Sequence, residues 1–353
     1  MRSPSSPEFR RHADEFGTYL AHLDIDDPGA ALKRLIDADF ACLPLPGHGH
    51  TIDRWRVLAA VGARDLSLAK LFEGHTDALA ILAEAQAQAQ SSAATATAAR
   101  PVPGSIWATW CAEPPEARLL ASARPDGSVA LSGRKAWCSG AHAVSHAVVS
   151  CWNQDGQAVL AAVELRQAGV SITDNGWNAV GMRATASVDI DFDGVIATPL
   201  GGPGFYVARA GFWHGGAGVA ACWFGAATRL AATLGARVAA RPDPHRLAQL
   251  GAITVALQSC AALMRETAAA IDRAPHASAM LGALSVRLSV EAAATQTLEL
   301  AGRALGAGPL CKDPHSARLF ADLPVYLRQS HAERDQEAVG TLAAASESAP
   351  WTL

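Results

Sequence analysis

Apolar residues recur at helical spacing through the first hundred residues of the chain. Asp27-Pro28 combines a capping side chain with a proline at the first helical position, and the leucines that follow lie on one face. The same spacing predicts a second helix over Thr51–Lys70, followed by an alanine-rich helix that ends in a loop at Ser91–Ala99. Residues 1–103 are therefore predicted to form an α-helical domain.

The pattern changes to short β-type runs between residues 104 and 202. Val188, Ile190 and Phe192 alternate with polar residues, as expected for a half-buried strand. Turn signals such as Asp193-Gly194 separate runs of this kind. The expected strands are Ser105–Ala112, Ser128–Ser132, His146–Trp152, Ala158–Leu165 and Ser187–Phe192. This segment predicts a small antiparallel β-barrel or sandwich over residues 104–202.

The last segment, residues 203–353, returns to a helical pattern. It is rich in alanine and is interrupted by proline and glycine at a few points. The four long stretches that remain cover roughly 205–240, 244–271, 275–305 and 315–345. Long helices joined by short breaks predict a C-terminal four-helix bundle, and the whole chain is predicted to be an α+β multidomain protein.

Composition narrows the classes of function. Half of the 353 residues are hydrophobic and 18% are charged, so a large core is available. The net charge of −4 gives no electrostatic reason to expect binding to nucleic acid or to an anionic membrane surface. The twelve histidines are scattered without metal-ligand spacing, so no metal site is expected. The seven cysteines contain no CxxC pair, which is typical of reduced, mostly buried thiols.

Two observations bear on location. The first residues contain no apolar run of the kind found in secretory signals. The longest uninterrupted apolar runs, such as Ala217–Ala227, are shorter than a bilayer span requires. We therefore expect a cytoplasmic protein without a membrane span.

Six short motifs occur in a characteristic order over about residues 30–340. Among them, Trp137 lies in a segment that resembles the pattern NGxKxWITNG, and Met182 lies in one that resembles LGMRxSxT. The motifs are Trp110–Pro114, Leu131–Ala141, Val180–Ala186, Ile190–Val195, Ala304–Gly308 and Arg318–Asp322. Together with the helix–strand–helix order, they resemble the acyl-CoA dehydrogenase superfamily. This resemblance implies bound FAD and a homodimer or homotetramer.

The resemblance also implies roles for residues of the β-rich segment. Trp137, Cys138 and Ser139 would lie beside the isoalloxazine ring of FAD, with the Ser139 hydroxyl near N5. Trp110 and Cys111 would lie on the neighbouring strand, also near the ring. The alternative interpretation is that Trp137 is a core aromatic, that Ser139 belongs to a plain turn and that Trp110 and Cys111 make ordinary strand packing.

Three residues of the last segment are implied to hold the rest of FAD. Gly306 and Gly308 would let the backbone approach the pyrophosphate–adenosine part across a subunit boundary, and Arg241 would contact a phosphate. Two glycines between helices are equally what an ordinary helix–helix turn requires.

The catalytic carboxylate of the family is not where the resemblance places it. Its usual position is occupied by Ser330, and the comparable stretch near His214 also lacks a glutamate. His331 and Glu333 are therefore the candidate catalytic bases, with His214 as a further one. The alternative is that His331 and Glu333 form a solvated polar patch.

Three functions follow from these observations. The leading one is α,β-dehydrogenation of an acyl thioester, carried by CoA or an acyl-carrier protein, with hydride transfer to FAD and an unspecified electron acceptor. A flavin-dependent monooxygenase of the same fold is the second. A non-catalytic homologue that serves as a binding or assembly protein is the third. The missing carboxylate favours the last two, whereas the loop around Trp137 favours a bound flavin.

Overall fold

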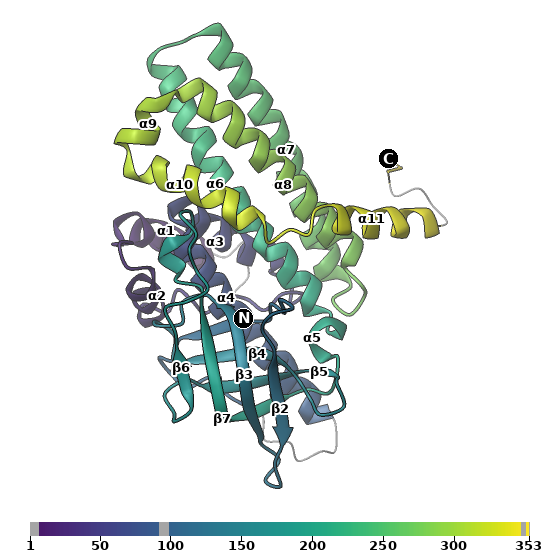
Figure 1. Ribbon diagram of the computed structural model, residues 1–353. Helices are drawn as coiled ribbons and strands as arrows, with labels where there is room; N and C mark the ends of the chain where they lie inside the picture. Colours follow the sequence, from purple (N-terminus) through teal and green to yellow (C-terminus); the bar gives the residue numbers. More distant parts are fainter. Residues whose placement is uncertain (1–6, 92–98, 347–350, 353) are drawn as a thin grey trace. The chain divides into compact units, whose positions relative to one another are not determined.

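The computed structural model describes residues 7–91, 99–346 and 351–352 (Figure 1). Contacts group the chain into two compact units, each built from separate stretches. Unit 1 contains Met1–Ala21, Pro44–Leu66 and Trp213–Leu353, and unit 2 contains His22–Leu43 and Ser67–Phe212. The three predicted domains, with boundaries at residues 103 and 202, follow the changes from helix to strand and back to helix along the sequence. These boundaries stay a prediction.

Four helices precede the first strand: α1 (Pro7–His22), α2 (Pro28–Asp37), α3 (Thr51–Arg64) and α4 (Leu66–Ser91). The predicted start of α2 is confirmed, because the Asp27 carboxylate accepts hydrogen bonds from the backbone N–H groups of Gly29 and Ala30. The single helix predicted over Thr51–Lys70 is wrong. Asp65 is extended, with φ −165°, and separates α3 from α4. Most of the expected loop at Ser91–Ala99 lies outside the described residues.

Unit 2 is built around one seven-stranded sheet. Its strands are β1 (Trp107–Trp110), β2 (Leu119–Ala123), β3 (Val129–Cys138), β4 (His146–Trp152), β5 (Ala158–Glu164), β6 (Val170–Ile172) and β7 (Val188–Leu200). The order β4-β2-β3-β7-β5 closes on itself, because β5 also pairs with β4. Most pairs are antiparallel, while β1 and β2 run parallel to β4. The predicted β-barrel is confirmed, with these parallel contacts added.

The sequence pattern located the middle strands well and their ends less well. His146–Trp152 is confirmed residue for residue, and β7 shows the predicted alternation of buried and partly exposed side chains. The turn predicted at Asp193-Gly194 is instead a bulge inside β7: Leu131 pairs with Val195 and Gly133 with Phe192. Gly194 has φ 64°, which suits glycine at such a bulge. The short strands β2 and β6 were not predicted.

The core of unit 2 lies between α4 and the sheet. Ala78, Ile81 and Leu82 of α4 form one buried cluster with Trp107 of β1 and Val148 of β4. α4 is rich in alanine, yet these larger side chains anchor it. The helix therefore stands directly behind the strands that carry the β-type motifs.

The C-terminal segment forms seven helices within the described residues. They are α5 (Phe205–Ala208), α6 (Gly211–Ala240), α7 (Pro244–Arg273), α8 (Met280–Leu305), α9 (Ala307–Lys312), α10 (Pro314–Leu327) and α11 (Glu333–Ala345). The long helices α6, α7 and α8 correspond to three of the predicted stretches; α7 packs against α8, which also contacts α10 (Figure 1). The fourth stretch, 315–345, is not one helix: it is broken between Leu327 and Glu333. The predicted fold class, with helices, a β-barrel and a helical bundle, is confirmed.

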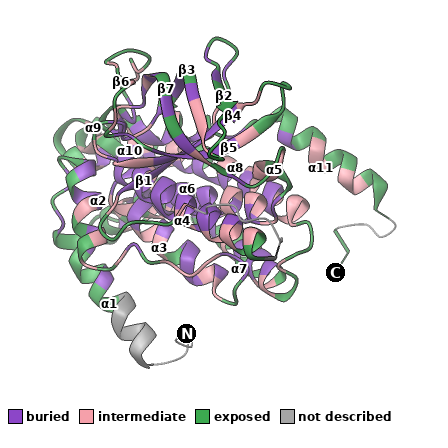
Figure 2. Ribbon diagram, turned by 90° about the horizontal axis from the view of Figure 1, so that it is seen from below, coloured by how far each residue is buried: buried purple, intermediate pink, exposed green. Residues whose placement is uncertain are grey.

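Glycine permits a close crossing of α3 and α6 in unit 1. A Cβ atom added to Gly62 would lie 2.3 Å from the carbonyl oxygen of Cys222, and one added to Gly225 would lie 1.9 Å from that of Ala59. Both distances are far below van der Waals contact, so larger residues would separate the helices. Around this crossing α6 is almost wholly buried (Figure 2).

Helices α6 and α7 are each 30 residues long and apolar enough to meet the length and composition of a membrane span. The expectation from uninterrupted apolar runs was therefore too strict. In α6, 67% of the most apolar window is buried within the protein, as in a core helix, whereas the figure for α7 is 22%. Length and composition are weak grounds for a span, since core helices share them.

Candidate functional site

β3 bulges near its C-terminal end, where Trp137 turns out of the sheet. Lys135 pairs with Ile190 of β7 and Cys138 with Val188, so β3 carries one extra residue between these pairs. Trp137 has φ 56°, and half of the residue is exposed. A left-handed backbone is unfavourable for a bulky residue, and exposure of an indole adds to the cost. Packing alone does not account for this arrangement.

The loop that follows Trp137 is held by neighbours on three sides. The Trp110 Nε1–H donates to the carbonyl oxygen of Ser139 at 3.0 Å, and the Gly140 N–H donates to that of Thr185 at 2.7 Å. Gly140 has φ 72°, and a Cβ atom there would lie 3.0 Å from Cγ of Leu71 on α4. Glycine is therefore required at this point for both backbone geometry and space.

Three hydroxyl groups form a chain behind the loop. Ser139 Oγ lies 2.7 Å from Ser187 Oγ, which lies 2.8 Å from Thr185 Oγ1. The Thr185 hydroxyl donates to the carbonyl oxygen of Met182 at 2.8 Å, across the short 3₁₀ turn Arg183–Thr185. Thr185 and Ser187 are buried, whereas Ser139 is partly exposed. We call Ser139, Ser187 and Thr185 the hydroxyl chain, and these residues with Trp110 and Trp137 the Trp137 site.

A buried lysine supports the same end of β3. Lys135 is only 2% exposed, and its Nζ donates to Glu113 Oε1 at 2.7 Å and to the carbonyl oxygen of Ser150 at 2.9 Å. The Trp152 Nε1–H donates to the second carboxylate oxygen of Glu113 at 2.9 Å. Partial burial would raise the pKa of Glu113, but the hydrogen bonds from Lys135 and Ser150 outweigh it, and the pKa is lowered. Glu113 is thus an ionised carboxylate with a structural role, fixed by its hydrogen bonds to Lys135 and Trp152.

The two cysteines implied to lie near a flavin are protonated at neutral pH. Burial raises the pKa of Cys111 to about 11, although Lys135 opposes this shift. Burial also raises the pKa of Cys138 far above its ordinary value. Neither thiol is therefore a ready nucleophile.

A shallow recess opens beside the Trp137 site within unit 2. It is lined by residues of α4, of β1 and of the loops around Ser139: Lys70, Leu71, Gly74, Trp107, Ala108, Thr109, Trp110, Ser139 and Val144. None of these nine described residues is an aspartate or a glutamate. The walls are aromatic and aliphatic, with the hydroxyl groups of Thr109 and Ser139 among them.

The Trp137 site suits the isoalloxazine ring of a flavin. The ring is flat and needs an aromatic or apolar face, which the half-exposed indole of Trp137 offers. It also needs a hydrogen-bonding group at its edge, and Ser139, which is partly exposed, is one of the residues that line the recess. The structure thus brings together Trp110, Trp137 and Ser139 as predicted. Within the described residues, no group of three His, Cys, Asp or Glu side chains could hold a metal ion.

The other predicted residues belong to unit 1. His331 and Glu333 are both exposed, the first in the connection between α10 and α11 and the second at the start of α11. His331 Nδ1 lies 3.5 Å from Asp335 Oδ1. His214 is buried on α6. Arg241, Gly306 and Gly308 are exposed, after α6, after α8 and in α9, respectively. Their proposed roles stay predictions.

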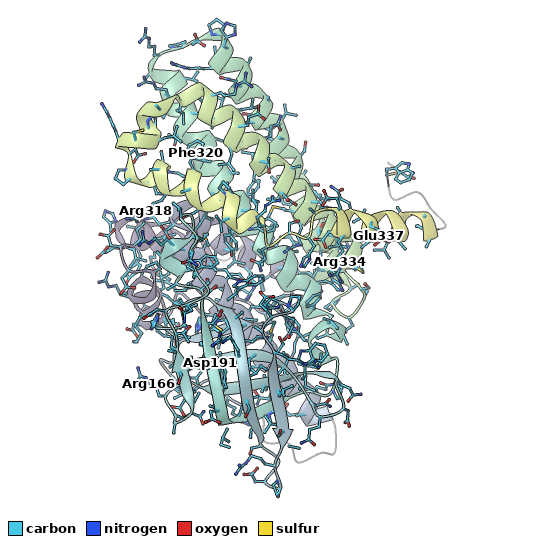
Figure 3. The ribbon with its side chains drawn as sticks, in the orientation of Figure 1. Arg166, Asp191, Arg318, Phe320, Arg334 and Glu337 are labelled. Atoms are coloured by element: carbon cyan, nitrogen blue, oxygen red, sulfur yellow. The ribbon has the colours of Figure 1, made fainter. Side chains whose placement is uncertain are left out.

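The break that carries Ser330 and His331 is held by a buried arginine of α8. Arg287 donates to the carbonyl oxygen of Gly216 on α6 at 2.8 Å and to that of Gln329 at 2.9 Å. Its guanidinium also lies 5.0 Å from the ring centre of Trp223. The main chain of the break is therefore fixed, although α11 itself is mostly exposed and displays charged side chains such as Arg334 and Glu337 (Figures 2 and 3).

Solved structures match this arrangement over nearly its whole length. The FMN-bound TdsC of Paenibacillus sp. A11-2 superposes with a TM-score of 0.75 at 19% identity, covering 96% of both chains. Butyryl-CoA dehydrogenase of Megasphaera elsdenii superposes with a TM-score of 0.78 at 15% identity, covering 97% of this chain and 99% of that one. No protein-family model matches the sequence.

The chain therefore has the acyl-CoA dehydrogenase fold, which confirms the resemblance carried by its motifs. Among curated proteins, a dibenzothiophene monooxygenase of Rhodococcus erythropolis is 29% identical over 183 residues. The aligned part makes up 43% of this chain and 43% of that relative.

Proposed function

We propose that this protein is a flavin-dependent monooxygenase whose Trp137 site binds the isoalloxazine ring. The observation that carries the proposal is the sequence at the two places where the resemblance would put the catalytic carboxylate. One of them is Ser330, and the other, the stretch near His214 on α6, also contains no glutamate. Dehydrogenation of an acyl thioester requires a base for the α-proton, whereas transfer of an oxygen atom does not require one at that place. The partial sequence match to dibenzothiophene monooxygenases supports the same choice.

The residues of the Trp137 site would have distinct roles in the monooxygenase. Trp137 offers its ring face to the flavin, Ser139 offers a hydrogen-bonding group at the ring edge, and Trp110 fixes the Ser139 main chain. A reduced flavin supplies two electrons and two protons, so that one atom of dioxygen enters the substrate and the other leaves as water. Lys135 and Glu113 keep β1, β3 and β4 in register beneath the site.

The recess also indicates a class of substrate. Trp107, Trp110, Leu71 and Val144 present apolar surface, and Lys70, the one charged residue of the lining, is already paired with Glu73. The recess itself has room for about one water molecule, so the class of substrate rests on the apolar character of these residues and on the partial match to dibenzothiophene monooxygenases. We therefore propose an aromatic substrate.

α,β-Dehydrogenation of an acyl thioester is the second candidate, supported by the full-length fold match to butyryl-CoA dehydrogenase. In that function His331 or Glu333 would act as the base, and the flavin would be FAD. Arg241, Gly306 and Gly308 would then contact its pyrophosphate–adenosine part.

One experiment separates the two functions. The purified chain is incubated with FMN or FAD, NADH, a flavin reductase and indole under ¹⁸O₂, and the product is analysed by mass spectrometry. The proposal predicts incorporation of one ¹⁸O atom that depends on the chain and on the reductase. The dehydrogenase is tested by anaerobic mixing of the flavin-loaded chain with a panel of acyl-CoA thioesters. Bleaching of the flavin band there, without a reductase, would overturn the monooxygenase.

A further inference from the structure

Unit 2 contains a buried group of charged side chains that the proposed function does not use. Asp77 and Glu84 lie on the same face of α4, about two turns apart. Arg209, which follows α5, reaches both of them. The side chains of Asp77 and Arg209 are 10% and 3% exposed, and that of Glu84 is 31% exposed. We call these three residues the Arg209 cluster.

Arg209 is a permanent cation that contacts its two carboxylates unequally. Burial would lower the pKa of Arg209, but Asp77 and Glu84 outweigh it, and the pKa is raised. The Arg209 Nη1 group donates a hydrogen bond to Glu84 Oε2 at 3.3 Å. Its Nη2 atom lies 3.8 Å from Asp77 Oδ1, which is too long for a hydrogen bond. Glu84 is therefore bonded directly to the guanidinium, whereas this oxygen of Asp77 is not.

The long contact leaves two buried atoms without a hydrogen bond. Among the described residues, neither Asp77 Oδ1 nor Arg209 Nε has a hydrogen-bond partner. The carboxylate oxygen can only accept a hydrogen bond, and the guanidinium nitrogen can only donate one. Buried polar atoms without a partner are rare, because each has lost its hydrogen bonds to bulk water. An unused acceptor and an unused donor on the two partners of one long ion pair are the groups that a bridging water satisfies.

The surroundings of the Arg209 cluster favour a small polar ligand. The Arg209 guanidinium lies 5.4 Å from the ring centre of Tyr206. Burial raises the pKa of Tyr206 well above its ordinary value, and Cys111 and Asp77 raise it further, so the hydroxyl stays protonated and lies near Asp77. Tyr206 and Cys111 pack against the buried cluster between α4 and the sheet. A buried water needs about two to four polar partners, and this place offers two with a third nearby.

We propose that Asp77 Oδ1 and Arg209 Nε bind a buried water molecule, which accepts a hydrogen bond from Arg209 and donates one to Asp77. This water completes the attachment of the segment after α5 to α4. A Cβ atom added to Gly211, the first residue of α6, would lie 1.8 Å from Glu84 Oε1 and 2.6 Å from Arg209 Nη1. The main chain at the start of α6 therefore packs directly on the Arg209 cluster, and the water helps to fix where α6 begins. The site is independent of the proposed flavin.

Crystallography and ¹⁷O magnetic relaxation dispersion test the proposal together. A high-resolution crystal structure of the chain should show a water within about 3 Å of both atoms. Relaxation dispersion counts the long-lived buried waters in solution. Asp77→Leu removes the acceptor, so the water should be lost and the count should fall by about one. Asp77→Asn keeps an oxygen acceptor and should keep the water. Asp155→Leu, at an exposed position between β4 and β5, is the control and should leave the count unchanged.

Three results would overturn the proposal. The first is a crystal structure in which Arg209 Nε donates directly to Asp77 and no water lies between them. The second is an ion or a larger molecule at that place. The third is an unchanged count of buried waters in Asp77→Leu. Circular dichroism verifies the fold of each variant, and if Asp77→Leu does not fold, the wild-type and Asp77→Asn crystal structures decide. None of these results bears on flavin binding, so this inference and the proposed function fail separately.

Discussion

The two groups of predicted site residues differ sharply in how the protein holds them. In the loop after Trp137 in unit 2, Ser139 is held at its main chain by Trp110 and at its side chain by Ser187, and both neighbours are buried. In unit 1, His331, Glu333 and Arg241 are exposed, and the contact of His331 with Asp335 is 3.5 Å long. Functional groups that must keep one geometry need such support from a second layer of residues.

This contrast favours a functional role for Trp137 over one for His331. The unfavourable conformation and exposure of Trp137 persist because Lys135, Gly140 and the hydroxyl chain fix its surroundings. His331 has no comparable surroundings among the described contacts of its side chain.

Lys135→Met should lower the free energy of unfolding by roughly 2–4 kcal/mol, because it leaves the partly buried Glu113 without its cation. Urea denaturation followed by tryptophan fluorescence measures the change. Arg134→Met is the matched control, since Arg134, the neighbour of Lys135 on β3, forms an exposed ion pair with Asp191 of β7; Asp191 is labelled in Figure 3. Its effect should stay below about 1 kcal/mol. Equal effects of the two substitutions would show that the pair of Lys135 and Glu113 does not support the site.

Trp137→Ala should weaken flavin binding by about 2 kcal/mol, roughly thirtyfold, because the ring loses its stacking partner. Stability should not fall, since the change removes an exposed indole. Flavin fluorescence titration and thermal unfolding report the two properties separately. Trp351→Ala, another exposed tryptophan, serves as the control and should leave flavin affinity unchanged.

Acid should destabilise the protein through Glu113. The pKa of Glu113 is lower in the folded protein than its ordinary value of 4.5, so this carboxylate stabilises the fold above that pH. The contribution is lost as the pH falls through the lowered pKa. A pH series of unfolding experiments should show a smaller acid loss for Glu113→Gln than for the wild type. Parallel curves for the two proteins would contradict the assignment.

His331→Ala should have the smallest effect, below about 0.5 kcal/mol in stability and less than twofold in flavin affinity, because the side chain is exposed. The same two measurements as for Trp137→Ala apply. A large loss of turnover with unchanged flavin binding would instead identify His331 as the base of a dehydrogenase.

Local signals in the sequence predicted much of the fold. The Asp27 cap, the β7 alternation and the strand His146–Trp152 all follow from neighbouring residues alone. The missed strand β2 reads Leu-Leu-Ala-Ser-Ala, a composition with weak β preference, and pairing with β3 decides its conformation. Asp193-Gly194 shows the reverse error. This dipeptide is typical of turns, but here it forms a bulge within β7, because β3 pairs with β7 on both sides of it.

The site was predictable only in part, for a similar reason. Motif order located Trp110, Trp137 and Ser139, but no local pattern joins Ser139 to Ser187, which is 48 residues away. The sequence Thr185-Ala186-Ser187 beside the Met182 motif shows two hydroxyl residues close together, but Thr185 ends a 3₁₀ turn and Ala186 has φ 41°, so their spacing alone does not predict the contact. The Lys135–Glu113 pair likewise depends on the register of strands far apart in the sequence.

A crystal structure of this protein with FMN bound would show directly whether the Trp137 site holds the flavin. We expect the isoalloxazine ring to lie against the indole of Trp137, with N5 within about 3 Å of Ser139 Oγ. A flavin bound elsewhere, with Trp137 still exposed to solvent, would contradict it.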